Sequence, residues 1–179
     1  MREAYSFQDY IHDYAVWTAA RAVQRKFTST QRIKEAIDQS TLREFSESRE
    51  CSTAEEFNNF HISCSNQIIE TLKKANVANP TYGRAAKIIA IYLKTSLIIP
   101  MAGQGVICQF IHPPIDRILL TNLSKEHKIK KLCEKGWTAL NEVEYWHLYE
   151  RIKLEKLKFD WSLEKYWQPE QEKIESDKL

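Results

Sequence analysis

Two side chains in the most apolar stretch of the sequence are of the types that covalent catalysis requires. Lys87 lies among alanines and isoleucines in "YGRAAKIIAIYL", and Asp116 closes the proline-rich "IHPPID". A lysine that is partly desolvated at a helix start has a lowered pKa, because burial and the helix dipole both disfavour its charge. The resulting free amine is the nucleophile that Schiff-base formation needs. A lysine whose stem covers apolar surface while its ammonium stays in water explains the same spacing.

Asp116 also has two interpretations. It comes just before the apolar segment "ILL", where an aspartate commonly caps a helix by accepting backbone N–H bonds. An aspartate that is fixed at a helix start is equally a well-oriented catalytic carboxylate. The two roles are therefore compatible.

Five further polar residues are candidates for binding. Arg21, Gln24 and Arg25 follow three- and four-residue steps in "ARAVQRKF", a pattern that a solvated helix face explains equally well. His112 is either a hydrogen-bonding loop residue or a site residue. Arg117 either forms a local salt bridge or contacts phosphate.

Other common enzyme motifs do not occur in the sequence. It contains no glycine-rich phosphate loop, no HExxH pair and no serine nucleophile elbow. His61 and Cys64 have the spacing of metal ligands on one helix face, but no second ligand pair accompanies them. We therefore expect neither a metal nor a cofactor.

The elements that must position these residues are predicted to be helices. Only four glycines and five prolines occur in 179 residues, which is few for a β meander. The sequence has no internal repeat and no low-complexity linker, which predicts one compact all-α bundle over residues 1–168. Residues 169–179 are expected to form a charged, frayed tail.

The helix boundaries follow from periodicity and capping residues. The first helix is expected over about 7–26, with Phe7, Tyr10, Ile11, Tyr14, Trp17 and Arg21 on one face and Ala15, Ala19, Ala20 and Ala22 permitting close helix approach. The following starts are expected near Thr30 after a Thr28–Gln31 capping box, near Ala54, near Gly83 after Thr81, near Asp116, at Ser124 and after Asn141. The segment "FDWSLEKYW" is expected to pack back onto the body, and Trp137, Trp146, Trp161 and Trp167 to be packing residues.

Charge and cysteine content restrict the cellular context. The net charge is +2, which is compatible with nucleic-acid binding but does not indicate it. Four separated cysteines without a signal peptide predict reduced thiols and a cytoplasmic protein. Residues 85–103 contain Lys87 and Lys94, and each charge would cost about 3 kcal/mol at a membrane-helix centre, so no membrane span is expected.

The order of these features resembles the helix-hairpin-helix DNA glycosylase superfamily. In that family an early helix ends in a polar, glutamine-containing stretch, a turn with glycine leads into the helix of the catalytic lysine, and a proline-rich loop delivers an aspartate. The corresponding segments here are "WTAARAVQRKFTSTQRIKEAI", "NPTYGRAAKIIAIYL" and "IHPPIDRILL". The 29-residue separation of Lys87 from Asp116 is most similar to the archaeal 8-oxoguanine glycosylase branch. Only Gly83 remains of the family's glycine-rich hairpin.

The resemblance implies a glycosylase and lyase mechanism. Lys87 would attack C1′ of a damaged nucleotide, expel the base and form a Schiff base, while Asp116 would stabilise the oxocarbenium charge. The partner would be DNA whose target base is flipped out of the duplex. Backbone N–H groups near Tyr82 and Gly83 would hold a phosphate, and Arg84 would add charge.

Two other functions stay open from the sequence. A non-catalytic helical module could bind nucleic acid or protein through its arginines rather than through Lys87. A small-molecule enzyme or sensor could bind a nucleoside-like ligand in a pocket between Trp17, Tyr82, Tyr92 and His112. The sequence predicts no oligomeric state.

Overall fold

The computed structural model describes residues 5–23, 27–129, 132 and 135–168. The structure is compact and 68% helical, and the described residues contain no strand, which confirms the predicted all-α class. The elements in chain order are α1 (Phe7–Val23), α2 (Thr30–Asp38), α3 (Leu42–Ser48), α4 (Ala54–Lys74), α5 (Tyr82–Leu93), the π-helical η1 (Lys94–Ile98), the 3₁₀ turn η2 (Ile107–Gln109), α6 (Arg117–Glu126), the 3₁₀ turn η3 (Trp137–Ala139), α7 (Glu142–Leu154) and the 3₁₀-helical η4 (Trp161–Tyr166).

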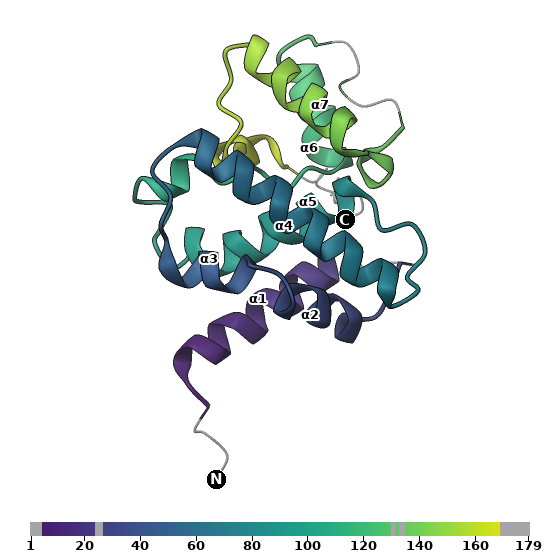
Figure 1. The fold of residues 1–179 in the computed structure, drawn as a ribbon. Helices are drawn as coiled ribbons and strands as arrows, with labels where there is room; N and C mark the ends of the chain where they lie inside the picture. Colours follow the sequence, from purple (N-terminus) through teal and green to yellow (C-terminus); the bar gives the residue numbers. More distant parts are fainter. Residues whose placement is uncertain (1–4, 24–26, 130–131, 133–134, 169–179) are drawn as a thin grey trace, which may run out of the picture.

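Helix α5 forms the centre of the fold. Helices α1 and α4 pack against it, and α7 and η3 contact it from the other side (Figure 1). Ten of its twelve residues are buried, as expected of a helix that is surrounded by others. On α1, Ala15, Ala19 and Ala20 are fully buried, which confirms that small side chains permit close helix packing.

A helical hairpin places Lys87 near the start of α5. Helix α4 begins at a capping box of Thr53 and Glu56. The turn over residues 75–81 contains two asparagines with positive φ, a backbone region that asparagine tolerates better than most residues. Thr81 then caps α5 by accepting the N–H of Arg84, as predicted.

Two hydrophobic clusters meet along α5. Ala85, Ile88 and Ile89 belong to the cluster with α1 and α4, whereas Tyr82 and Ala86 belong to the cluster with α6, α7 and η4. Lys87 therefore lies at the boundary between the two clusters, where its side chain is buried but still lines a cavity.

The aromatic face of α1 points to solvent, because the alanine-rich face is the one that packs against α5. Two local predictions are wrong. Helix α2 is capped by Ser29, whose hydroxyl accepts the N–H of Arg32, rather than by Thr28. Ser124 lies inside α6 and donates to the carbonyl of Leu120 instead of starting a helix.

The other predicted helix starts agree with the structure, whereas the expected end of the first helix at about residue 26 lies outside the described residues. Asp116 and Asn141 cap α6 and α7, and the end of α5 continues as η1. In the described part of the chain, no helix combines the length and the apolar character that crossing a membrane demands. The predicted tail over 169–179 lies outside the described residues.

Candidate functional site

The amine of Lys87 is buried against a carboxylate. Only 6% of the residue is exposed, and its Nζ donates to Oδ2 of Asp116 at 2.9 Å and to the carbonyl oxygen of Pro114 at 3.0 Å. Burial lowers the pKa of Lys87, an effect that the nearby negative charge of Asp116 opposes only in part. The buried position of Lys87 fits the interpretation of a desolvated amine and not that of a lysine whose ammonium stays in water.

Asp116 is fixed by three donors. Its Oδ1 accepts the N–H of Leu119 at 2.9 Å and thereby caps α6. Its Oδ2 accepts from Lys87 and from the indole N–H of Trp167 at 2.8 Å. The capping role is thus confirmed, and the same contacts hold the carboxylate facing the amine.

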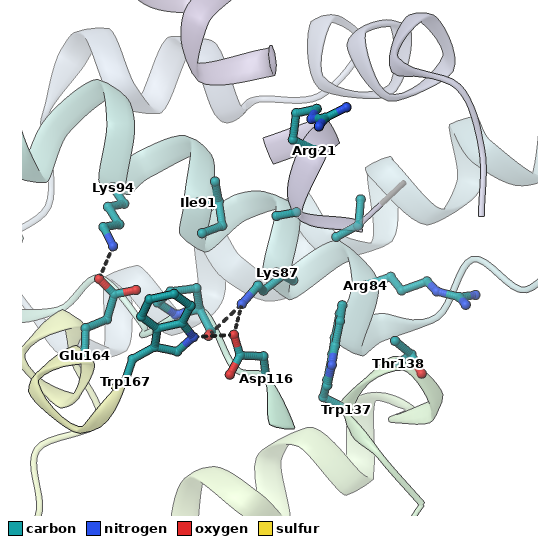
Figure 2. Close-up of a pocket in the computed structure, with 13 residues that line it drawn as sticks. Arg21, Arg84, Lys87, Ile91, Lys94, Asp116, Trp137, Thr138, Glu164 and Trp167 are labelled. Atoms are coloured by element: carbon teal, nitrogen blue, oxygen red, sulfur yellow. Dashed lines mark hydrogen bonds and ion pairs between the residues drawn. The ribbon is translucent and has the colours of Figure 1, made fainter. Parts of the chain in front are cut away.

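Lys87 and Asp116 line one cavity of about 570 Å³. Figure 2 shows the pair between the indoles of Trp167 and Trp137. The Trp137 ring centroid lies 5.7 Å from the Lys87 Nζ. Arg21, Arg84 and Lys94 also line the cavity, together with Ala22, Val23, Ile91, Pro114, Thr138 and Glu164. An aromatic, partly cationic cavity with an amine inside it suits a flat, negatively charged ligand.

The wall that carries Trp137 is bound tightly to the start of α5. Thr81 donates its hydroxyl to the carbonyl of Thr138 at 2.7 Å, and the N–H of Gly83 donates to the carbonyl of Leu140 at 3.0 Å. A Cβ at position 83 would lie only 2.0 Å from the carbonyl oxygen of Trp137. Glycine is therefore required for this close approach.

The opposite wall comes from the end of the described chain. Glu164 of η4 forms an ion pair with Lys94 at the start of η1 (Figure 2). Asn122 of α6 donates to the carbonyls of Tyr166 and Gln168. These contacts hold Trp167, which is 42% exposed, at the edge of the cavity.

The predicted phosphate cradle at the start of α5 is already engaged within the protein. The N–H of Gly83 bonds to Leu140 and that of Arg84 to Thr81, while the ring of Tyr82 is buried and its hydroxyl lies 3.0 Å from His61 Nδ1. These contacts leave the side chain of Arg84, which lines the cavity, as the group of this turn best placed to meet an anion.

The arginine side chains differ in their placement. Arg84 lies over the Phe27 ring at 4.3 Å and donates to the carbonyl of Asn79. Arg21 is exposed and lines the same cavity. Arg117 is exposed at the start of α6 and does not line it, and the predicted Gln24 and Arg25 lie outside the described residues.

His112 is not part of this cavity. Its ring is buried and bonds to the hydroxyl of Tyr145 and to the amide oxygen of Asn58. The interpretation as a hydrogen-bonding residue within the fold therefore describes His112 better than a role beside Lys87.

The nucleoside pocket expected between Trp17, Tyr82, Tyr92 and His112 does not form. Trp17 is exposed on α1, and Tyr92 is buried against His12. Tyr82 and His112 both pack on the ring of His61. These residues do not converge, because α5 separates the two clusters.

The sequence interpretation missed the residues that form the walls. Trp137 and Trp167 were expected only to pack, and Lys94 served only as an argument against a membrane span. The available signal was the recurrence of tryptophan in a strongly charged part of the chain, as in "GWTAL" and "LEKYW". Their joint position depends on long-range contacts that no local pattern encodes.

A second set of buried polar side chains lies around His61, away from the Lys87 cavity. His61 and His112 lie 4.8 Å apart between ring centroids, among Tyr82, Tyr145 and Trp146. Among the described residues, Nε2 of His61, Oγ of Ser65 and Nε1 of Trp146 are buried without a hydrogen-bond partner. Burial lowers the pKa of His61 to about 3 and, with His61 nearby, lowers that of His112 far below its usual value.

These histidines predict sensitivity to acid. In the unfolded chain a histidine binds a proton below about pH 6.5, whereas folded His61 stays neutral until about pH 3, so stability falls as pH decreases through that window. His61→Phe should remove on the order of 3 kcal/mol of the acid-induced loss at pH 4. Urea midpoints at pH 4 and pH 7 measure this, with His147→Phe on the exposed face of α7 as the control for the substitution. An equal acid-induced loss in wild type and His61→Phe would contradict the prediction.

The described residues show no group of three His, Cys, Asp or Glu side chains that could hold a metal ion. His61 and Cys64, which have metal-ligand spacing, are both buried on α4, and His61 bonds to Tyr82.

Comparison of the chain with protein-family models, with curated proteins and with solved structures gave no match. The function must therefore be argued from the site itself.

Proposed function

We propose that this protein is a DNA glycosylase and AP lyase that acts on a damaged or modified base through a Schiff base of Lys87. The observation that carries the proposal is the convergence of Lys87 and Asp116, 2.9 Å apart, on one cavity. The lowered pKa of Lys87 supports it, because a neutral amine is the reacting form.

The groups present suffice for the chemistry. The neutral Nζ of Lys87 bonds to C1′, and the bond from C1′ to the base breaks, so that the base leaves with the bonding electrons and takes up a proton. The sugar ring then opens at the C1′–O4′ bond, O4′ gains a proton, and the iminium forms between C1′ and Nζ. The Asp116 carboxylate next takes a proton from C2′, and the electrons of that C–H bond form a C2′–C3′ double bond as the 3′ phosphate leaves with the C3′–O bond electrons. Asp116 stabilises the positive charge that develops on the sugar.

The walls of the cavity suit an extruded nucleotide. Its volume of about 570 Å³ lies within the usual range for small-ligand sites. The Trp137 and Trp167 indoles offer stacking surfaces for a base, and Arg21 and Arg84 supply positive charge for the phosphates. Base flipping into such a site explains why the amine is buried.

Borohydride trapping tests the proposal. Wild-type protein is mixed with duplexes that contain an abasic site or one of a panel of damaged bases, and borohydride then reduces any Schiff base to a stable adduct. We expect a covalent protein–DNA species on gels and none with undamaged DNA. Failure to trap on the abasic duplex would overturn the proposed function.

The rate of adduct formation should increase with pH. Because burial lowers the pKa of Lys87, the neutral amine becomes abundant at a lower pH than in a free lysine, whose pKa is about 10.4. With an abasic duplex, single-turnover trapping should rise with pH and reach its plateau at a lower pH than a solvated lysine would. A rate that keeps rising in proportion to hydroxide up to pH 10 would indicate a solvated lysine.

A non-catalytic nucleic-acid-binding module is the second candidate. The observation in its favour is that the contacts of Lys87 with Asp116 and Pro114 also join α5 to the start of α6, which is a structural role. In that case Lys87→Gln lowers stability but leaves DNA affinity intact, and no adduct forms with the wild type. A thermal melt, a binding titration and the trapping assay together separate the two candidates.

A further inference from the structure

The outward face of α1 is aromatic. Phe7, Tyr10, Tyr14 and Trp17 recur at steps of three and four residues, and each is at least 51% exposed. Large aromatic side chains are normally buried, and a contiguous exposed set indicates an interaction surface. We call these four residues the aromatic stripe.

The stripe has a regular geometry. The rings of Phe7 and Tyr10 lie 6.3 Å apart between centroids with 17° between their planes, and those of Tyr14 and Trp17 lie 5.8 Å apart with 16°. Continuing the same step leads to Arg21. At a rise of 1.5 Å per residue, the distance along the helix from Phe7 to Arg21 is about 21 Å.

The stripe leads to the candidate site. Arg21 is both the next exposed residue of this face and a lining residue of the Lys87 cavity. The acidic residues beside the stripe are paired, since Asp9 binds Arg43 and Asp13 binds Lys34. The surface is therefore aromatic at one end and positively charged at the end that adjoins the cavity.

We propose that the aromatic stripe binds single-stranded nucleic acid, the unpaired strand that flanks the nucleotide in the cavity. Bases stack on aromatic side chains irrespective of sequence, and arginine neutralises the phosphate, which together form a single-strand binding surface. The location beside the cavity rests on the proposed function. The stripe is too small for a stable dimer, because it offers four side chains of one helix where such interfaces use about 20 or more residues per partner.

The test is a binding titration with an undamaged single-stranded oligonucleotide. Tyr14→Ala combined with Trp17→Ala should weaken binding about tenfold to a hundredfold, as expected from the loss of stacked bases. Leu154→Ala, at an exposed apolar residue of α7, is the matched control and should bind as wild type. Thermal melting confirms that the double variant folds, since both side chains are exposed.

The outcomes separate this inference from the proposed function. Loss of oligonucleotide affinity in the double variant, with Leu154→Ala binding as wild type, supports the stripe. No single-strand binding by wild type, or equal binding by the double variant, overturns it. A change from dimer to monomer in sedimentation with unchanged oligonucleotide affinity also overturns it and assigns the stripe to a second copy. Absence of borohydride trapping with intact single-strand binding contradicts the proposed function alone.

Discussion

Lys87→Gln is expected to reduce borohydride trapping on an abasic duplex by about 10³-fold or more. The substitution removes the only atom that forms the covalent bond while keeping a polar side chain of similar length, and loss of a nucleophile has effects of this size. Asp116 keeps its bonds from Leu119 and Trp167, so the start of α6 should stay folded. Single-turnover kinetics with gel analysis of the adduct measure the effect.

Two comparison variants sharpen this prediction. Lys94→Gln changes another lysine that lines the same cavity but supplies no attacking atom, so its adduct yield should fall far less than that of Lys87→Gln. Asp116→Asn should lower base release about 10²-fold, because it removes the charge that stabilises the sugar cation. If Lys87→Gln traps as well as wild type, or if Lys94→Gln is the variant that fails, Lys87 is not the nucleophile.

Gly83→Ala is expected to destabilise the protein by about 3 kcal/mol. The new Cβ would lie 2.0 Å from the Trp137 carbonyl oxygen and 3.1 Å from the Leu140 Cβ, and a backbone atom cannot move aside as a flexible side chain can. Alanine's higher helix propensity offsets only about 1 kcal/mol of this clash. The melting temperature should fall by about 6–12 °C for a chain of this size.

The same variant should weaken the site, because the wall that it displaces carries Trp137. Trapping at a temperature where the variant is folded should therefore be slower than in wild type. A melting temperature within a degree of wild type would contradict the close packing of η3 on α5.

Local signals were sufficient to predict the two central residues. Thr81 fixes the start of α5 and Asp116 the start of α6, because each accepts a backbone N–H three residues on, which depends on sequence neighbours alone. The apolar neighbours of Lys87 in the helix allowed either a buried amine or an ammonium in water, and the long-range contact with Asp116 decides for burial.

Long-range packing explains what the sequence did not predict. On α1 both faces are apolar, one with aromatic side chains and one with alanines, and the choice of the alanine face depends on how closely α5 can approach. The cavity walls include Trp137 of η3 and Glu164 of η4, which lie 50 and 77 residues beyond Lys87 in the sequence. The glycosylase resemblance itself remains a proposal that only chemistry can test.

Peptide mapping of the reduced adduct tests the central claim most directly. Wild-type protein is trapped on an abasic duplex with borohydride, digested with nuclease and protease, and analysed by mass spectrometry. We predict that the sugar remnant is attached to Nζ of Lys87. A remnant on Lys94 or on another amine, or no adduct at all, would contradict the account.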